Sequence, residues 1–236
     1  MLTILAYAVS ILFLLGFGWK IFLYARSPAP LKIPTTPAPV TRAGVIWRLF
    51  TEVALFNSLF KGDKWAWAGA MAFHGALVLV AVRHLRYFVD PLPASFHMLQ
   101  IFGIVAGLVM VAGLGLLFLR RLVIDRVRYI SSPADYLILL MLLGLGFSGL
   151  LMSFFLRPDI VGIKQALLGM WGSVQGLPAA SSPGDVVFLA HLFLALLLFT
   201  IFPFSKLMHL GGIFFSPTRN QIDNPREERH VNPWAS

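Results

Sequence analysis

The chain has 236 residues, of which 58% are hydrophobic and only 12% are charged, with no cysteine and a formal net charge of +9. A soluble domain needs a more polar surface, so this composition predicts a protein that is dissolved in lipid. Without a thiol the chain has no disulfide, no thiolate zinc site and no iron–sulfur ligand of its own. No helix-turn-helix, zinc finger or phosphate-binding glycine motif occurs in it, so nucleic acid is not expected as a partner.

Five stretches are hydrophobic over the roughly 20 residues that a helix needs to cross a bilayer. They cover residues 2–24, 66–88, 97–119, 134–156 and 186–208. We therefore expect an all-α fold, an integral membrane bundle of five transmembrane helices within residues 1–215, followed by a polar cytoplasmic tail at 216–236. The first stretch is too long for the apolar part of a signal peptide, and its charges, Lys20 and Arg26, follow it, which favours a retained span.

The charges between the spans predict the orientation of the chain. Segments 25–65 and 120–130 carry six and four Lys/Arg residues, whereas 83–97 and 157–185 carry two each. Basic loops collect on the cytoplasmic side of a membrane. We therefore expect the N-terminus outside and the C-terminus in the cytoplasm, with membrane lipid around the spans.

Shorter patterns predict the connections between these spans. The pentapeptides Ser-Ser-Pro-Ala-Asp at 131–135 and Ser-Ser-Pro-Gly-Asp at 181–185 each combine a capping serine, a proline at the first helical position and an acid in the first turn. Each should therefore begin a helix, the fourth and the fifth span. Proline-rich residues 27–41 predict an extended connector, and amphipathic residues 43–60 predict a helix along the cytoplasmic interface. Residues 160–176 are expected to form a short outer helix.

Four of the six histidines belong to two predicted spans, with His209 one residue beyond the end of the fifth. His74 and His84 are ten residues apart on the second span, or about 15 Å in depth, and His191 and His209 are eighteen apart on the fifth, or about 27 Å. Ionisable residues inside a membrane are costly and commonly functional. In the orientation above, His74 and His209 lie toward the cytoplasm. His84 and His191 then lie toward the outside, and two helices that each present one histidine per leaflet can hold two stacked haems.

The geometry of this histidine set is imperfect, and alternatives stay open. Ten residues fall about 80° short of three helical turns, so His74 and His84 do not share a face, and the two separations in depth differ. Tilted helices and a kink at Pro203 would have to absorb the mismatch. A histidine can also make an interhelical hydrogen bond or bind copper or zinc. However, no carboxylate or thiol lies at a matching depth to complete such a metal site.

Residues near the histidines are further candidates for cofactor contacts. Arg83 and Arg86 flank His84 and either pair with haem propionates or anchor the helix at the interface. Glycine-rich stretches on the third and fourth spans are more typical of close helix packing than of room for a macrocycle. At the junction of the second and third spans, His97 and Gln100 are candidates for a quinone site beside the outer haem, within an interfacial aromatic belt.

Five spans with this histidine spacing resemble the membrane gamma subunit of respiratory nitrate reductase. In that family, the positions matching His74, His84, His191 and His209 ligate the iron of two b-type haems. Within that superfamily the chain resembles more closely the DsrM family, the membrane cytochrome b subunits of DsrMKJOP complexes in dissimilatory sulfur metabolism. The stretches that carry this resemblance are TPAP at 36–39, LFNSLF at 55–60, RHLRYF at 83–88 and NPREERHVNPW at 224–234.

The resemblance implies a dihaem b electron-transfer subunit of a quinone-dependent oxidoreductase, with menaquinone or ubiquinone as exchangeable substrate. It implies a prokaryotic inner membrane and a cytoplasmic heterodisulfide-reductase-like iron–sulfur subunit as partner, against which the tail is expected to dock through Trp234. The other implied partners are a second membrane subunit, a periplasmic c-type cytochrome and a periplasmic iron–sulfur protein. The direction of electron flow stays open.

Besides a passive anchor for partner subunits, which would not need the four histidines, two other functions stay open. One is the gamma subunit of a respiratory nitrate reductase, against which the NPREERHVNPW run argues. The other is a histidine-relay transporter, which would need further ionisable groups at depth. No Asp, Glu or Lys lies deep in any predicted span.

Overall fold

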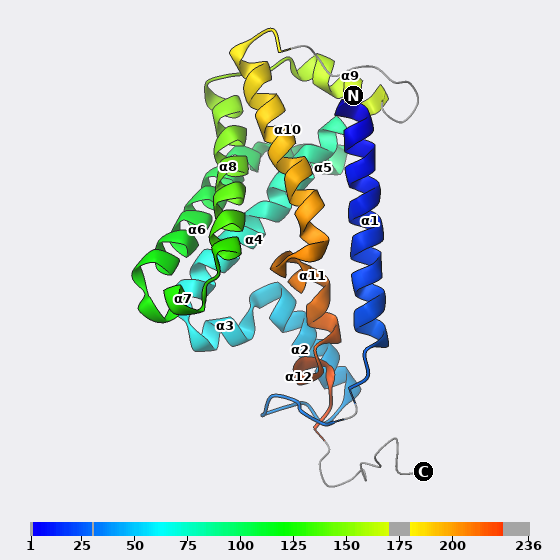
Figure 1. The fold of residues 1–236 in the computed structure, drawn as a ribbon, viewed down its shortest axis with the longest axis vertical. Helices are drawn as coiled ribbons and strands as arrows, with labels where there is room; N and C mark the ends of the chain where they lie inside the picture. The colour runs from blue at the N-terminus through cyan, green and yellow to red at the C-terminus, as the bar shows by residue number, and fades with distance from the viewer. Residues whose placement is uncertain (1, 30, 170–179, 224–236) are drawn as a thin grey trace. The chain divides into compact units, whose positions relative to one another are not determined.

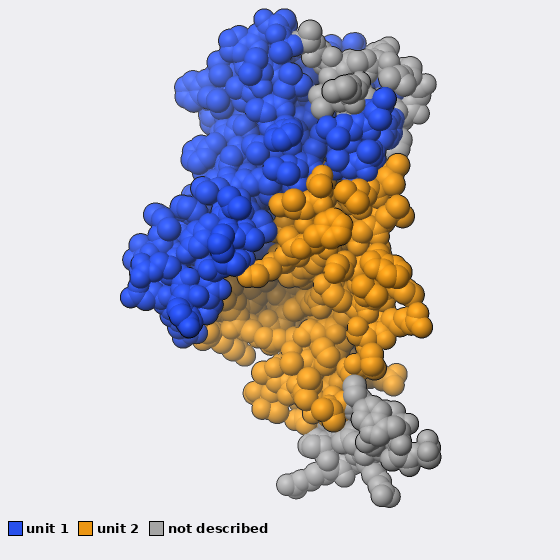
Figure 2. All heavy atoms as spheres, viewed as in Figure 1, with its two compact units in different colours: residues 1–9, 63–198 blue, residues 10–62, 199–236 orange. Residues whose placement is uncertain are grey.

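The computed structural model describes residues 2–29, 31–169 and 180–223, and within these ranges the chain is helical without a strand (Figure 1). The chain divides into two compact units (Figure 2). Unit 1 comprises Met1–Val9 and Asp63–Leu198, and unit 2 comprises Ser10–Gly62 and Phe199–Ser236. The boundaries fall inside α1 (Leu2–Arg26) and α10 (Pro183–Ile201), so each of these helices contributes to both units.

Five helical segments are long and apolar enough to cross a membrane. They are Ile4–Arg26, Lys64–Tyr87, Gly103–Val123, Pro133–Phe154 and Pro183–Phe204. Between 6% and 33% of the residues in the most apolar part of each span are buried, so most residues of the spans are at least partly accessible to lipid. The predicted all-α membrane bundle of five spans is confirmed, and the orientation of the termini stays a prediction.

The centre of unit 1 is a row of three helices, in which α6 (Gly103–Val123) packs between α4 (Lys64–His84) and α8 (Pro133–Phe154) (Figure 1). Its core joins α4 to α6 through five buried side chains. These are Phe73, Ala76, Ala106, Met110 and Leu114. Small residues let the helices approach closely: a Cβ at Gly107 would lie 3.0 Å from Leu150 of α8. This contact supports the packing interpretation of the glycine-rich stretches.

Three of the span helices, α4, α8 and α10, begin at acidic caps. Asp185 Oδ2 accepts the Ser182 N–H at 2.9 Å, and Asp135 Oδ2 accepts the Ser132 N–H at 2.9 Å. Both carboxylates are buried, and the predicted helix starts at the two pentapeptides are confirmed. At the start of α4, Asp63 Oδ1 accepts the Ala66 N–H at 2.9 Å.

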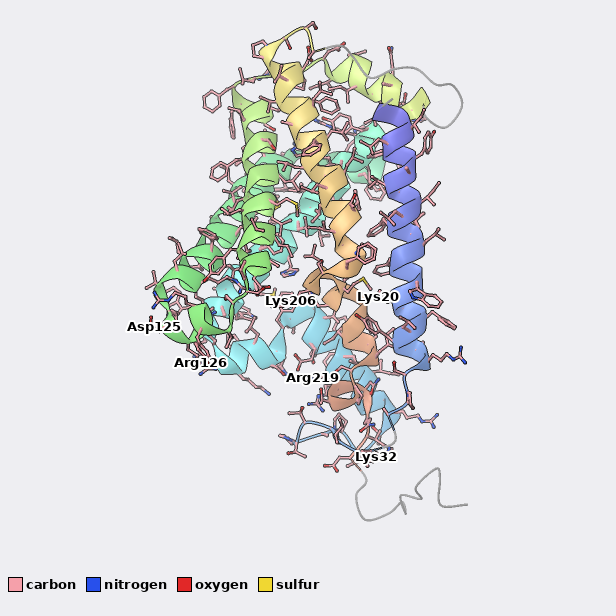
Figure 3. The ribbon with its side chains drawn as sticks, in the orientation of Figure 1. Lys20, Lys32, Asp125, Arg126, Lys206 and Arg219 are labelled. Carbon is pink, nitrogen blue, oxygen red and sulfur yellow. The ribbon has the colours of Figure 1, made fainter. Side chains whose placement is uncertain are left out.

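Asp63 also forms an ion pair with Arg120 from the last turn of α6. The Ala66 N–H and the Arg120 guanidinium hold the pKa of the Asp63 carboxyl below its ordinary value of 3.8. The turn beyond α6 forms α7 (Asp125–Ile130), where Figure 3 labels Asp125 and Arg126. The start of α4 is therefore tied by charge to the end of its neighbour.

The third predicted span, 97–119, is wrong as one continuous helix. The chain forms α5 (Ala94–Ile101), turns at Phe102 and begins α6 at Gly103. A Cβ at Gly103 would clash with the Arg83 side chain, so the first residue of α6 packs closely on the end of α4. Apolar residues continue across the break, and hydropathy alone does not reveal it. His97 consequently lies on α5 and not on the span.

The fifth predicted span, 186–208, is also interrupted. The helix α10 ends at Ile201, because Pro203 has no N–H for the helical hydrogen bond and its ring would clash with the preceding turn. After the 3₁₀ turn η2 (Phe202–Phe204), Ser205 is extended at φ −121° and ψ 175°. The chain then forms the 3₁₀ turn η3 (Lys206–Met208) and α11 (His209–Gly212). His191 and His209 therefore do not share the face of one helix, and the expected five-turn spacing does not apply.

In unit 2, α1 packs on the end of α10 and on the turn that follows it. The ring of Phe13 makes edge contacts with Phe199 at 5.0 Å and with Phe202 at 5.4 Å between ring centroids. The amphipathic segment predicted at 43–60 forms α2 (Arg42–Leu55) and α3 (Asn57–Gly62), which confirms its helical character.

A polar cluster joins these helices to the chain after α11. Between α2 and α3, Phe56 has a left-handed backbone, φ 49° and ψ 46°, and the turn brings Ser58 back to Glu52 at 2.5 Å between Oγ and Oε1. Arg219 of α12 (Pro217–Asn220), labelled in Figure 3, donates to Ser58 Oγ at 2.6 Å and to Glu52 Oε1 at 3.2 Å. This cluster fixes α12 against α2.

The first part of the predicted tail is bound to the proline-rich connector, whose described residues form no helix, as expected. Thr35 N donates to Thr218 O at 2.9 Å, and Asp223 N donates to Pro39 O at 2.8 Å. Residues 216–223 therefore belong to unit 2, while residues 224–236, including Trp234, lie outside the described part of the chain.

Candidate functional site

His84 and His191 face each other in unit 1. His84 is the last residue of α4 and His191 lies on α10, and their ring centroids are 6.2 Å apart with planes inclined by only 4°. Two imidazoles on opposite sides of one metal ion have ring centres about 6.4 Å apart, because each metal–nitrogen bond is about 2.0–2.1 Å and each ring centre lies about 1.2 Å further on. The structure thus brings the predicted outer pair together at the separation of two ligands of one metal.

The hydrogen bonds of the histidines define which ring nitrogen carries the proton. The Nδ1 atoms of His74, His84 and His209 lie 2.8, 2.7 and 2.9 Å from the carbonyl oxygens of Ala70, Val80 and Lys206. A carbonyl oxygen can only accept, so Nδ1 is the donor in each neutral ring. The lone pair of each ring then lies on Nε2, which is the tautomer that a metal ligand requires.

His191 reaches the same tautomer through another helix. Its Nδ1 lies 2.8 Å from the Ser148 hydroxyl of α8, and that hydroxyl lies 2.7 Å from Gly144 O. Since the carbonyl takes the hydroxyl proton, Ser148 Oγ accepts the His191 Nδ1–H. Ser148 was not predicted from the sequence, where one hydroxyl on a span does not stand out from ordinary helix packing.

Two arginines lie at the same end of α4 as His84. Arg86 Nη2 donates to the Tyr87 hydroxyl at 2.7 Å, and its guanidinium lies 4.8 Å from the centre of the Tyr87 ring. Arg86 Nε is buried without a hydrogen-bond partner among the described residues, which costs about 1–3 kcal/mol unless an acceptor binds there. The Arg83 side chain runs across Gly103. A buried donor beside two facing histidines fits a cofactor with acidic side groups, such as haem.

The predicted quinone residues lie nearby on α5, which packs against α4. The His97 ring is exposed, and its Nε2 lies 3.1 Å from Leu92 O, so Nε2 donates to the loop before the helix. The side chain of Gln100 lies outside the described part of the structure. The assignment of His97 and Gln100 to a quinone stays a prediction.

An apolar groove of about 590 Å³ runs between α6, α8 and α10. Ser148 is the one polar residue of its lining, and the remaining lining residues are hydrophobic. They are Leu108, Phe147, Leu150, Leu151, Phe154, Phe155, Val186, Val187 and Ala190. Such a groove suits a hydrocarbon chain better than a polar head group, which needs hydrogen-bond donors.

The predicted inner pair is divided between the two units. His74 lies in unit 1, where its ring makes an edge contact with Phe73 at 4.6 Å, and His209 lies in unit 2 on α11. The pairing of His74 with His209 therefore stays a prediction.

Comparison with known proteins identifies the family. Residues 39–222 match the family model of the nitrate reductase gamma subunit. The chain belongs to the nitrate reductase gamma subunit family. This confirms the family resemblance seen in the spacing of the histidines, and the matched region of this family contains all four of them.

Several relatives align over most of their length. The Hdr-like menaquinol oxidoreductase cytochrome b-like subunit of Archaeoglobus fulgidus is 34% identical, with 98% of this chain and 82% of the relative aligned. Its counterpart in Archaeoglobus profundus is 30% identical, with 98% and 81% aligned. The nitrate reductase gamma chain of Bacillus subtilis is 33% identical, with 70% of this chain and 79% of the relative aligned.

Proposed function

We propose that this chain is the membrane cytochrome b subunit of a quinone-dependent oxidoreductase complex, binding two b-type haems and passing electrons between the quinone pool and a partner subunit. The observation that carries the proposal is the facing pair of His84 and His191, with ring centroids 6.2 Å apart and nearly parallel planes. Membership of the nitrate reductase gamma subunit family supports it, as do relatives named cytochrome b-like subunits of menaquinol oxidoreductases.

The residues of the outer site have distinct roles in this proposal. His84 and His191 would bind the haem iron, and the Val80 carbonyl and the Ser148 hydroxyl hold their rings through Nδ1. Haem iron supplies one-electron chemistry when bound. Arg86, with its unpaired buried Nε, and Arg83 bind propionates by charge-assisted hydrogen bonds.

The inner haem of the proposal is held by His74 and His209. Both have the tautomer with Nδ1 bound to a backbone carbonyl, which leaves Nε2 as the metal-binding atom. The two histidine pairs would hold two haems between which electrons pass.

The exchangeable substrate is menaquinone or ubiquinone, and the names of the Archaeoglobus relatives favour menaquinone. We assign it to the outer end, near His84, with His97 and Gln100 as head-group contacts. The groove beside Ser148 is apolar enough to hold an isoprenoid chain.

The partner is a cytoplasmic heterodisulfide-reductase-like iron–sulfur subunit, in a DsrMKJOP-type complex of sulfur metabolism in a prokaryotic inner membrane. The NPREERHVNPW run at 224–234 and the Hdr-like names of two relatives favour this assignment. The other members are a second membrane subunit, a periplasmic c-type cytochrome and a periplasmic iron–sulfur protein. The similarity to the Bacillus subtilis gamma chain favours the second candidate, a nitrate reductase gamma subunit.

An optical spectrum of the purified chain tests the proposal. We expect reduced b-type bands and two haems per chain by extraction, and one haem per chain after His191→Ala. The exposed His97 lies outside the proposed haem ligands, so His97→Ala is the matched control and should retain both haems. A chain purified from haem-sufficient cells without b-type bands would contradict the proposal.

A further inference from the structure

We propose that Ser148 is a positioning residue that sets the tautomer and ring plane of His191 and lowers the reduction potential of the haem bound there. The proposal rests on the proposed function, in which His191 is an axial ligand. It assigns a role to a hydroxyl on α8, a helix that supplies no haem ligand of its own.

The hydrogen bond of His191 differs from those of the other three proposed haem ligands, His74, His84 and His209. His84 donates to Val80 O, four residues earlier in its own helix, and His74 donates to Ala70 O in the same way. His191 instead meets Ser148, 43 residues away in sequence and on a different helix. A ring bound to its own helix turns with that helix, whereas the His191 ring is oriented by α8.

The direction of the hydrogen bond follows from the surroundings of the hydroxyl. Ser148 Oγ lies 2.7 Å from Gly144 O and 3.1 Å from Leu145 O, and both carbonyls can only accept. The hydroxyl has a single proton, which is donated to this carbonyl pair. Its lone pairs then face His191 Nδ1–H, so the three groups form a chain from imidazole to hydroxyl to carbonyl.

This chain changes the electronic character of the ligand. A hydrogen bond donated by the distal ring nitrogen increases the basicity of the nitrogen that binds the metal. A more basic ligand stabilises the oxidised metal more than the reduced metal. The haem held by His191 should therefore have a lower potential with Ser148 than without it.

Contacts of the surrounding backbone hold the Ser148 hydroxyl and the His191 ring at the same level of the helices. A Cβ at Gly149 would lie 3.6 Å from His191 Cε1, so the ring lies directly on α8. The helix α10 begins eight residues before His191. In its first turn, Asp185 Oδ1 accepts the Asp159 N–H at 3.2 Å. A Cβ at Gly184 would lie 2.5 Å from Arg157 O, so the backbones of these segments touch. These contacts fix the height at which His191 meets Ser148.

Redox titration of Ser148→Ala tests the proposal. We expect two haems to remain bound and one midpoint potential, that of the haem lost in His191→Ala, to become more positive while the other is unchanged. Ser148→Thr keeps the hydroxyl and should restore the wild-type value. Ser153→Ala is the matched control, because Ser153 also lies on α8 and its hydroxyl donates to Gly149 O at 2.9 Å within the same helix. It should shift neither potential.

Ser148→Cys covers the case in which the alanine variant does not fold, since a thiol of similar size is a weaker acceptor and should shift the same potential in the same direction. Unchanged potentials in every folded Ser148 variant, with one haem still lost in His191→Ala, overturn the role of Ser148 and leave the proposed function standing. Two haems retained in His191→Ala overturn the proposed function itself, and the role of Ser148 with it.

Discussion

Gly113 on α6 lies against the backbone nitrogen of Phe73 on α4, and a Cβ at position 113 would lie 2.9 Å from that atom. It would also lie 3.0 Å from Gly69 O. Backbone atoms inside two packed helices cannot turn aside as a flexible side chain can. We therefore expect Gly113→Ala to force α4 and α6 apart and to lower the free energy of unfolding by about 1–3 kcal/mol.

The matched control for this substitution is on the same helix. No atom lies within 4 Å of a Cβ built at Gly115. Gly115→Ala should therefore be neutral or raise the free energy of unfolding by about 0.5–1 kcal/mol, because alanine loses less backbone entropy than glycine in a helix. Unfolding of both variants in detergent, followed by circular dichroism, measures the difference. Equal effects would show that the contact with Phe73 is not tight.

The cluster around Glu52 predicts a second effect on stability. The Glu52 side chain is only 9% exposed, and Arg219 is its ion-pair partner at 3.2 Å. Arg219→Ala should lower the free energy of unfolding by about 1–3 kcal/mol, because it removes a donor from a buried acceptor. It should also make residues 216–223 accessible to protease, since α12 loses its hold on α2. Arg128→Ala, which breaks the exposed pair with Asp125, is the control and should change stability by about 0.5 kcal/mol or less.

The cap of α4 predicts a dependence on acid. The pKa of Asp63 is lower in the folded chain than its ordinary value of 3.8, so the folded state favours the ionised carboxyl. This contribution to stability is fully present above pH 3.8 and is lost as the pH falls through the lowered value. Below pH 3.8 the unfolding temperature of the wild type should therefore fall more steeply than that of Asp63→Asn. The control Asp125→Asn, at an exposed carboxylate, should keep the wild-type slope, and parallel curves for all three proteins would argue against the cap.

The pairing of the histidines predicts which haems are lost together. His84→Ala and His191→Ala should remove the same haem, because the two rings face each other at 6.2 Å. His74→Ala and His209→Ala should remove the other haem. Potentiometric titration of the remaining haem in each variant identifies it. If His74→Ala and His209→Ala leave different haems behind, the inner pairing is wrong.

The quinone assignment predicts a kinetic effect at the outer end. His97→Ala and Gln100→Ala should slow the reduction of haem by a quinol analogue, because each removes a group that can hydrogen-bond a quinone carbonyl. Both variants should keep their haem spectra. Stopped-flow reduction measures the rate, and Asp125→Asn provides an unrelated surface control. Normal rates in both variants, with reduction abolished by substitutions near His74, would place the quinone at the other end.

The features that could be predicted best are those set by residues close together in the sequence. The five spans follow from runs of apolar residues, and the starts of α8 and α10 follow from a serine, a proline and an acid within five residues. The facing of His84 and His191 was also predictable, because two antiparallel spans place residues of similar depth side by side.

Contacts between distant residues could not be predicted in this way. The break at Phe102 lies beside Gly103, on which the side chain of Arg83 packs from 20 residues away, and the apolar residues on either side conceal it. Ser148 depends on a partner in another helix. The binding of residues 216–223 to the connector depends on contacts such as that between Thr35 and Thr218. No local sequence pattern predicts such a contact.

The interruption at Ser205 divides the segment that carries His191 and His209 into two separate helices. If both residues lay on one continuous helix, a rotation of that helix about its axis would turn both imidazoles by the same angle. Here a residue in the extended conformation, preceded by Pro203, separates α10 from α11, so no continuous helix joins the two histidines. His191 and His209 are therefore each positioned by their own helix and not by one continuous helix.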